Sequence, residues 1–289
     1  MIMCFEIIKL LESSFIEIND LLRFTNSSSL SEITQINCSG DDVKKLDEVA
    51  NNILKENLKK CKDIRLIASE EEDSIIINNP EGKYMITYDP IDGSSNIKND
   101  ITVGSIFCLF KYDNDEMSGN NIVMAGYCLY SSCTKLILCM ENRMNIYQLN
   151  QNRQFTIIKE NYKIPVIGDS YAINQANQSK WCDKIVSDYI QKMILHKKTQ
   201  RWVGSLVADA HRVIMSGGVF IYPCDNKNKN GKIRLLYEAY PMAYIFKSGG
   251  GFSSDGNVSI LDLKFPENIH QKIPIFLFSK TEYELFQLT

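Results

Sequence analysis

The sequence predicts an α+β fold in the first half of the chain and an α/β fold in the second, on three observations. The chain has 289 residues, which is enough for one large domain or two of ordinary size. Strand-like segments follow one another over about residues 60–160, after two helical stretches. Beyond about residue 170 helical and strand patterns alternate, which is typical of α/β domains. We therefore expect two domains, at residues 1–163 and 164–289.

The first half is expected to form a mixed or antiparallel sheet flanked by helices. Apolar residues recur at helical spacing over 3–23 and 41–60, which predicts two amphipathic helices. Residues 25–40, rich in Ser, Thr and Asn, predict a loop between them. Apolar, β-prone runs predict strands at 64–68, 75–77, 84–88, 102–110, 122–130, 135–140, 144–149 and 154–158.

The second half is expected to alternate helices and strands. The predicted helices are 178–195, 203–216 and 238–248, and the predicted strands are 170–173, 218–222 and 274–278. The glycine run 249–251 is expected to end the last of these helices. It does not match a dinucleotide-binding loop, because no Gly-x-Gly-x-x-Gly follows a strand.

Composition indicates a globular protein of a reducing compartment. The chain is 44% hydrophobic and 23% charged with a net charge of −3, so the basic excess of a nucleic-acid-binding protein is absent. The nine cysteines are odd in number, lie partly in apolar runs and form no Cys-x-x-Cys pair, which favours free thiols and the cytoplasm. The sequence shows neither a signal-peptide pattern nor an apolar run long enough for a membrane span, so we expect no membrane association.

Residues 88–97, Tyr-Asp-Pro-Ile-Asp-Gly-Ser-Ser-Asn-Ile, carry the clearest chemical signal. Asp89 and Asp92 stand at the end of a predicted strand, where Pro90 stops hydrogen bonding along the sheet. Hard divalent cations prefer carboxylate and carbonyl oxygens, and substrate phosphate completes their coordination. The following turn offers N–H groups and hydroxyls to an anion. Its residues are Gly93, Ser94 and Ser95. This segment can therefore hold a metal ion and a phosphate group together.

Other acids and cations have both a functional and an ordinary interpretation. Glu70 and Glu71 begin an acidic run that could be a solvated surface cluster. Glu238 lies at the start of a mostly apolar helix, where an acid can serve the helix dipole or bind a ligand. Lys232 and Arg234 alternate along a short extended segment and could hold phosphate or simply face solvent.

The segment 88–97 resembles the metal-binding signature of the class I fructose-1,6-bisphosphatase family, within the lithium-sensitive sugar-phosphate phosphatases. Further family-like segments occur in family order, at residues 40–47, 69–71, 201–209, 217–223 and 231–238. The resemblance implies a layered two-domain sugar phosphatase fold, with metal-binding residues in 1–163 and substrate-binding residues in 164–289. It also implies metal-dependent hydrolysis of the 1-phosphate of fructose 1,6-bisphosphate to fructose 6-phosphate, a step of gluconeogenesis.

The resemblance assigns the metal-binding and catalytic residues. Family members use Mg²⁺, Mn²⁺ or Zn²⁺, with about two or three ions in each site. The matching metal ligands are Asp41, Glu70, Asp89, the Ile91 carbonyl, Asp92 and Glu238. The residues that match acids implicated in catalysis, through a further metal position or water activation, are Asp41, Asp47, Glu70 and Glu71.

The resemblance also assigns the substrate contacts. Besides Asp92 and the turn that follows it, the matching positions are Asn174, Arg201, Trp202, Tyr222, Lys232 and Arg234. Arg201 matches an arginine that reaches a neighbouring subunit's site, which implies at least a dimer, with a homotetramer expected. Trp202 and Asn177 stand where phosphate-binding tyrosines are usual, and Lys98 stands where an aspartate is usual.

Alternative functions stay open at this point. Sedoheptulose-1,7-bisphosphate, or both bisphosphates, could be the substrate, and a weakened regulatory relative is a further alternative. Inositol monophosphatases carry a different block where this chain has Tyr237-Glu238-Ala239. We expect weak or absent inhibition by AMP, because the sequence shows no counterpart of the family's amino-terminal phosphate-binding turn and has Lys111 in place of an arginine.

Overall fold

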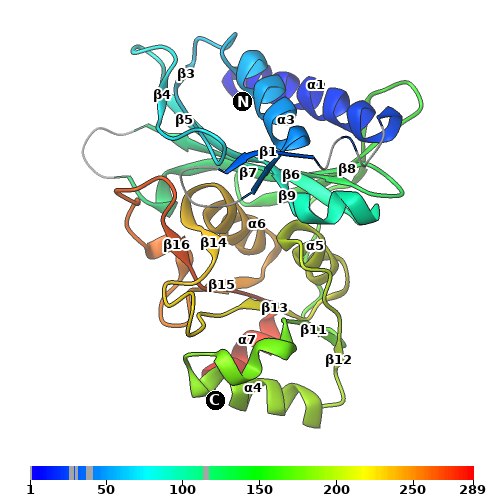
Figure 1. The fold of residues 1–289 in the computed structure, drawn as a ribbon, viewed down its shortest axis with the longest axis vertical. Helices are drawn as coiled ribbons and strands as arrows, with labels where there is room; N and C mark the ends of the chain where they lie inside the picture. Colours follow the sequence, from blue (N-terminus) through cyan, green and yellow to red (C-terminus); the bar gives the residue numbers. More distant parts are fainter. Residues whose placement is uncertain (1, 26–28, 30–31, 37–41, 113–116) are drawn as a thin grey trace.

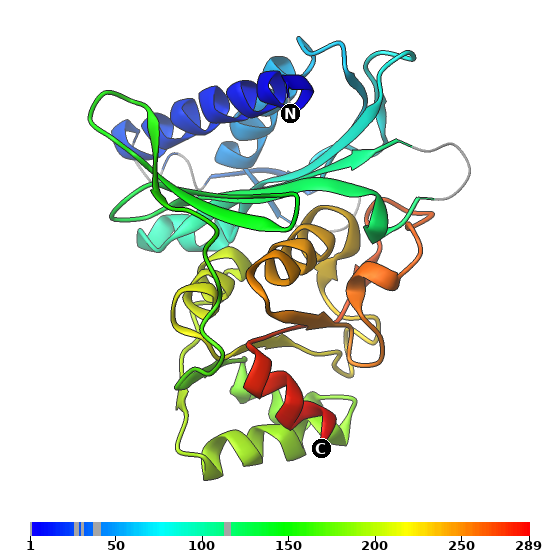
Figure 2. The same ribbon diagram turned by 180° about the vertical axis from the view of Figure 1, so that it is seen from behind.

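The computed structural model describes residues 2–25, 29, 32–36, 42–112 and 117–289, with the backbone alone for 2–3, 33–36 and 42–44. Two large sheets alternate with layers of helices, as Figures 1 and 2 show from opposite sides. The α+β layered fold predicted from the sequence is therefore confirmed. Among the helices of the described residues, none combines the length and apolar character needed to cross a bilayer.

The larger sheet has eight strands in the order β10-β9-β8-β7-β6-β5-β3-β4. Only the β3–β5 pairing is parallel, so the sheet is mixed as predicted. Its strands are β3 (Ile64–Ser69), β4 (Ile76–Ile77), β5 (Tyr84–Asp92), β6 (Val103–Lys111), β7 (Ile122–Tyr130), β8 (Lys135–Met140), β9 (Arg143–Leu149) and β10 (Phe155–Lys159). Each strand predicted for this half overlaps one of them.

Two helices cover one face of this sheet, α1 (Ile2–Phe24) and α3 (Lys45–Leu58) (Figure 1). Apolar side chains at helical spacing on both helices are buried against the strands. The Phe15 ring of α1 lies 5.7 Å from the Phe107 ring of β6, centroid to centroid. Burial of this apolar face fixes α3, which carries Asp47, against the strand that carries the acids.

The connection between these helices differs from the prediction. Strand β1 (Ile33–Ile36) pairs antiparallel with β2 (Asp42–Lys44), so the loop predicted at 25–40 is wrong over 33–36. The β-branched Ile33-Thr34 pair suits an extended backbone, which the Ser and Asn content around it concealed. Helix α3 consequently begins at Lys45 and not at residue 41.

The middle layer consists of α5 (Leu206–Ser216) and α6 (Tyr240–Gly249), which pack between the two sheets. Almost every residue of α6 is buried, which explains why its sequence is apolar all round. Gly250 ends α6 in the left-handed conformation with φ +82°, as predicted for the glycine run.

The smaller sheet has five strands in the order β12-β11-β13-β17-β15. These are β11 (Ser170–Ala172), β12 (Thr199–Gln200), β13 (Val219–Tyr222), β15 (Phe252–Ser254) and β17 (Ile275–Phe278). Helices α4 (Lys184–Leu195) and α7 (Lys280–Gln287) cover its outer face, towards the lower end in Figures 1 and 2. Strands β14 (Ile233–Arg234) and β16 (Lys272–Ile273) form a separate pair.

The helix predicted at 178–195 is divided in the structure. A 3₁₀ helix, η3, spans Gln175–Lys180, and α4 begins only at Lys184. Between them Trp181 pairs with Asp225 in an isolated antiparallel bridge, which needs an extended backbone. This long-range pairing overrides the local helical pattern. The predicted domain boundary falls in the connection between β10 and β11, and the division itself stays a prediction.

Candidate metal centre and substrate pocket

Three buried carboxylates gather at the junction of β5 and α6. Asp89 and Asp92 come from the end of β5, and Glu238 comes from the π-helical turn Leu235–Ala239 that leads into α6. One carboxylate oxygen of each lies within 4.8 Å of the others. Their exposed fractions are 1%, 6% and 8%. Carboxylate oxygens at this spacing can hold a hard divalent cation.

A bulge in β5 brings Asp89 and Asp92 to the same place. Residues three apart in a regular strand point to opposite faces of the sheet. Here Asp89 pairs with Ile106 and Asp92 with Gly104, so β5 has one residue more than β6 between these pairs. Pro90 suits this position because it has no N–H to donate, and its carbonyl accepts a 2.6 Å hydrogen bond from the Ser105 hydroxyl.

Asp92 is oriented by the amino terminus of α5. Its Oδ2 accepts hydrogen bonds from the Ser205 hydroxyl at 2.6 Å and from the Val207 N–H at 2.8 Å. Ser205 also caps α5, since its hydroxyl accepts from the Ala208 N–H. The amino terminus of α5 therefore holds one oxygen of Asp92 in place beside the acid cluster.

Glu238 is held by its own turn. The Arg234 N–H donates to Glu238 Oε2 at 2.5 Å, and the Thr87 hydroxyl of β5 donates to the Leu236 carbonyl at 3.1 Å. The turn is thereby tied to the strand that carries the aspartates. The buried guanidinium of Arg234 has its Nε 3.9 Å from Glu70 Oε1. Arg234 thus lies with the acids, where it partly balances their charge.

The electrostatics of this cluster fit a bound cation. Burial, followed by the neighbouring carboxylate of Glu70, raises the pKa of Asp89 and of Glu238 well above the usual range. Burial likewise raises the pKa of Asp92, although Ser205 opposes the shift. Among the described residues no hydrogen-bond donor reaches Asp89 Oδ1, which is fully buried. A divalent ion would satisfy that oxygen and reverse the repulsion, so the residues fit the metal implied by the sequence.

The other predicted acids of the described residues come from the segments next to this centre. Glu70 follows β3, its N–H bonded to the Tyr88 carbonyl, and its charge acts on Asp89 and Glu238. Asp47 is buried on α3 and also acts on Asp89. Glu71 is half-buried beside Glu70. Asp41 lies outside the described residues. The Ile91 carbonyl belongs to the β5 bulge.

A hydrogen-bond network that supports the acid cluster was not predicted from the sequence. The Tyr88 hydroxyl donates to Asn51 Oδ1 at 3.1 Å, and Asn51 Nδ2 donates to Glu72 Oε1 at 2.7 Å. Lys55 pairs with the same Glu72 oxygen at 2.5 Å. This network joins α3 and β5 to the acidic segment after β3. The sequence spacing gave no signal for it because its members come from three separate elements.

The turn after Asp92 approaches α5 closely. Gly93 has φ +80°, and a Cβ placed on it would lie 2.6 Å from Ser205 Cβ. Glycine is therefore required both by conformation and by space. Ser94 and Ser95 begin the 3₁₀ helix η1 (Ser94–Asn99) directly after it. The turn lies next to the acids, where its polar groups can face an anion.

Three of the predicted substrate residues share one small pocket. Asn174, Trp202 and Tyr222 line it, together with Asn177, Trp181, Ile221, Pro223 and Asp225. The Trp202 ring stacks on Phe220 at 5.9 Å and lies 5.8 Å from Tyr222, centroid to centroid. Lys232 is exposed and acts electrostatically on Asp225 at the pocket. Arg234 does not join this group, since it lies with the metal-site acids.

Arg201 precedes Trp202 in the chain but does not line this pocket. Its side chain is exposed, while its N–H donates to the Tyr171 carbonyl and its carbonyl accepts from Arg212 at 2.9 Å. Arg212 also pairs with Asp209, whose carboxylate accepts from the N–H groups of Val203 and Gly204. The backbone of Arg201 is thus fixed while its guanidinium extends outward.

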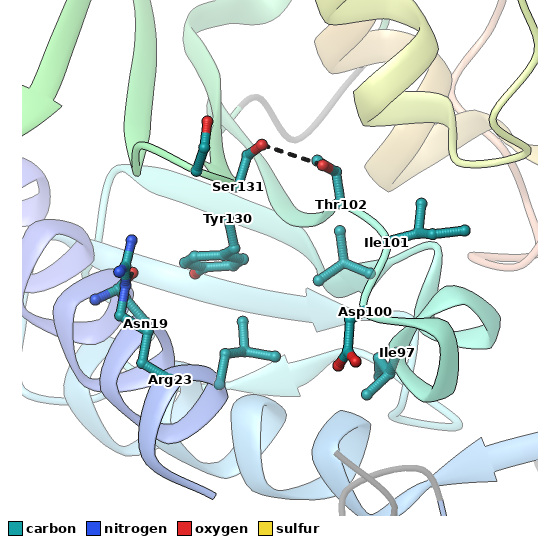
Figure 3. Close-up of a pocket in the computed structure, with 11 residues that line it drawn as sticks. Asn19, Arg23, Ile97, Asp100, Ile101, Thr102, Tyr130 and Ser131 are labelled. Atoms are coloured by element: carbon teal, nitrogen blue, oxygen red, sulfur yellow. Dashed lines mark hydrogen bonds between the residues drawn. The ribbon is translucent and has the colours of Figure 1, made fainter. Parts of the chain in front are cut away.

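A larger hollow of about 300 Å³ lies beside α1, away from the acids. Figure 3 shows Asn19 and Arg23 of α1 facing Tyr130 and Asp100 across it, with the 3.2 Å hydrogen bond between Thr102 and Ser131 at its rim. None of the described residues that line it is a predicted site residue. The candidate active site is therefore defined by the acid cluster and not by the size of a cavity.

Three buried carboxylates spaced so that they can hold one metal ion, on a layered α+β fold, define a candidate metal-dependent phosphatase. The family model described as "Fructose-1-6-bisphosphatase, N-terminal domain" matches residues 11–160, and "Fructose-1-6-bisphosphatase, C-terminal domain" matches 164–288. The chain belongs to the fructose-1,6-bisphosphatase family.

Individual relatives agree with this assignment. Fructose-1,6-bisphosphatase class 1 of Sulfurihydrogenibium sp. is 42% identical over 256 residues, 86% of this chain and 79% of the relative. Fructose-1,6-bisphosphatase 1 of Bos taurus is 38% identical, over 86% of this chain and 78% of its own length. The holo crystal structure of Leishmania major fructose-1,6-bisphosphatase superposes with a TM-score of 0.92 at 32% identity, covering 98% of this chain and 93% of that one.

Proposed function

We propose that this protein hydrolyses the 1-phosphate of fructose 1,6-bisphosphate, in a metal-dependent reaction, to fructose 6-phosphate and phosphate, as a step of gluconeogenesis. The observation that carries the proposal is the buried cluster of Asp89, Asp92 and Glu238, with an oxygen of Asp89 that no described donor satisfies. Membership of the family supplies the reaction, and the cluster supplies the residues that it requires.

Mg²⁺ is the proposed metal, with Mn²⁺ or Zn²⁺ as alternatives. We assign as its ligands Asp89, Asp92, Glu238, Glu70, the Ile91 carbonyl and Asp41. A divalent ion, when bound, polarises the phosphoryl oxygens and lowers the pKa of a bound water. The hydroxyl of Ser205 orients Asp92 for this purpose and favours its ionised form, against the rise in pKa that burial causes. Glu70, Glu71, Asp47 and Asp41 are proposed to accept the proton of the attacking water or to hold a further ion.

The substrate is held at both ends in this proposal. The turn Gly93–Ser95 presents N–H groups and hydroxyls to the reacting phosphate beside the acids. The pocket of Asn174, Trp202 and Tyr222 takes the distal phosphate, with the ammonium group of Lys232 nearby. Arg234 acts from the acid side, balancing the carboxylates and the incoming phosphate.

Arg201 is proposed to complete the site of a neighbouring subunit in a homo-oligomer, a tetramer or at least a dimer. Its outward guanidinium on a fixed backbone supports this role. Mixing an Arg201→Ala chain with an Asp92→Asn chain should then restore some activity, because a hybrid can contain one site that lacks neither residue. No recovery despite demonstrated subunit exchange would contradict the shared site. We also place the protein in the cytoplasm, which the free thiols of the described cysteines support.

Phosphate release from two substrates tests the proposed function. With Mg²⁺ we expect rapid release from fructose 1,6-bisphosphate, with fructose 6-phosphate as product, and loss of release after chelation. Sedoheptulose 1,7-bisphosphate measured in parallel decides between the two sugar bisphosphates. Fructose 1-phosphate serves as a matched control, because it lacks the group that the distal pocket is proposed to bind. Equal kcat/KM for the mono- and bisphosphate would contradict the assignment of that pocket.

A further inference from the structure

Cys182 and Cys224 face each other across a short ribbon that the secondary-structure pattern did not predict. Trp181 pairs antiparallel with Asp225. The Cys182 N–H donates to the Cys224 carbonyl at 3.3 Å on one side of this bridge, and the Asn226 N–H donates to the Lys180 carbonyl at 2.9 Å on the other. The two cysteines are therefore direct cross-strand neighbours.

Their backbone spacing suits a covalent bond. Directly opposed residues at a hydrogen-bonded antiparallel position have Cα atoms about 5.5 Å apart. Disulfides join Cα atoms that are most often about 5.5–6 Å apart. Their side chains project from the same face of the ribbon, because opposed residues share a face. Joining the two sulfurs needs rotation of side chains and no large movement of the backbone.

The two thiols differ in access and in reactivity. Cys182 is exposed, whereas Cys224 is 8% exposed. The thiol of Cys224 donates to Asp183 Oδ2 at 3.6 Å, and the thiol of Cys182 lies close enough to raise its pKa. Burial, together with Cys182 and Asp183, raises the pKa of Cys224 to about 12. An external reagent therefore meets Cys182 first, and Cys224 reacts second.

We propose that Cys182 and Cys224 are a thiol modification site, which a glutathione-type disulfide converts into an intrachain disulfide. The Cys182 thiolate attacks one sulfur of the reagent, forming a mixed disulfide and releasing one glutathione thiol. Cys224 then attacks the Cys182 sulfur, transfers its proton through Asp183 to solvent, and expels the second glutathione. The two cysteines lose two electrons in total, and one glutathione disulfide is reduced to two thiols.

This bond would act on the proposed distal phosphate pocket, and that consequence rests on the function proposed above. The ribbon forms one wall of the pocket, since Trp181 and Asp225 line it. The space between the lining side chains is about 10 Å³, roughly what one water molecule needs. A phosphate group is larger than this space, so the pocket has to widen, and we take the wall formed by η3 and Trp181 to be the part that shifts away from Tyr222. A Cys182–Cys224 bond would restrain that shift.

Mass spectrometry tests the bond independently of activity. The full chain is incubated with glutathione disulfide, its free thiols are alkylated, and its non-reduced peptides are analysed. We expect a peptide pair joined through Cys182 and Cys224 that dithiothreitol separates. Cys224→Ser should stop at glutathione attached to Cys182, and Cys133→Ser, at an exposed cysteine elsewhere, should give the same yield as wild type. An unmodified Cys182, or wild-type protein with glutathione on Cys182 and an alkylated Cys224, would overturn the proposal.

Kinetics of the same samples test the link to the pocket. Oxidised wild-type protein should show a several-fold higher KM for fructose 1,6-bisphosphate with kcat nearly unchanged, and reduction should reverse it. Cys182→Ser should show no change on oxidant treatment. An unchanged KM with the bond formed would refute the effect on the pocket. A reduced protein that releases no phosphate would instead refute the proposed function, while the mass spectrum would still decide the disulfide.

Discussion

Replacing Ser205 with alanine tests how the acid cluster is oriented. Ser205 contributes to the proposed site only through Asp92, whose Oδ2 it contacts at 2.6 Å in a buried environment. After Ser205→Ala the Val207 N–H still holds this oxygen, but one of its two donors is lost. We expect Asp92 to bind a proton more readily and a divalent ion less tightly.

The size of the effect follows from the contacts. A hydrogen bond to a charged group contributes about 1.5–3 kcal/mol. Loss of a residue that orients a metal ligand typically costs about 10–100-fold in metal affinity, which is about 1.4–2.8 kcal/mol. The hydrogen bond by which Ser205 caps α5 is weaker than its bond to Asp92, because the Ala208 nitrogen lies 3.4 Å from the Ser205 hydroxyl. Loss of the cap alone should lower the free energy of unfolding by only about 0.5–1 kcal/mol, and loss of the buried bond to Asp92 adds to this.

The assay is a titration of phosphate release with Mg²⁺, alongside urea unfolding. Ser205→Ala should raise the half-saturating Mg²⁺ concentration by about 10-fold or more. Ser205→Gly should do the same with a smaller loss of stability, since glycine is tolerated as an N-cap. Ser118→Ala removes a cap far from the acids and should change stability alone. The reasoning is refuted if both variants at 205 keep the wild-type half-saturating concentration.

Three further outcomes are expected. Gly93→Ala should greatly reduce activity and stability, because the new Cβ combines strain at φ +80° with a 2.6 Å contact to Ser205 Cβ. Gly250→Ala is the control: at φ +82° it has the same strain but open space, and it should cost only about 1 kcal/mol in urea unfolding. Burial lowers the pKa of His211 from 6.5 to about 4, so the unfolded chain binds a proton more readily than the folded one between these pH values. The free energy of unfolding should therefore fall by about 3 kcal/mol as the pH drops from 6.5 to 4. His211→Gln should remove this pH-dependent loss of stability. Because burial raises the pKa of Asp89 and Glu238, protons compete with the metal, and the half-saturating Mg²⁺ concentration in the phosphate assay should rise as pH falls.

Local patterns were sufficient for most of the fold. Long apolar, β-prone runs predicted the strands of the large sheet, because each is determined by its own residues and its bounding turns. The wrong predictions of secondary structure lie where pairing with a distant segment determines the backbone conformation. Strand β1 exists through its pairing with β2, and the break between η3 and α4 accompanies the bridge from Trp181 to Asp225.

In the candidate site, too, local features were predictable from the sequence and contacts between distant segments were not. Asp89, Pro90 and Asp92 are close in sequence and carry a recognisable pattern, so their importance was evident from the sequence. The bulge that turns both aspartates to one place depends on register with β6, which the sequence does not express. Ser205 and Cys224 went unrecognised because the groups that they contact are remote in the chain.

The central claim is that Asp89, Asp92 and Glu238 bind the divalent ion on which phosphate release depends. The most direct measurement combines Mn²⁺ binding with phosphate release from fructose 1,6-bisphosphate in wild type and in Asp92→Asn. Asp100→Asn is the matched control, an exposed aspartate with φ 55°, a conformation that asparagine tolerates. We predict that Asp92→Asn folds normally but loses Mn²⁺ affinity and nearly all activity, while Asp100→Asn keeps both. Folded Asp92→Asn that binds Mn²⁺ as wild type does, or keeps more than about a tenth of the activity at saturating metal, would contradict the claim.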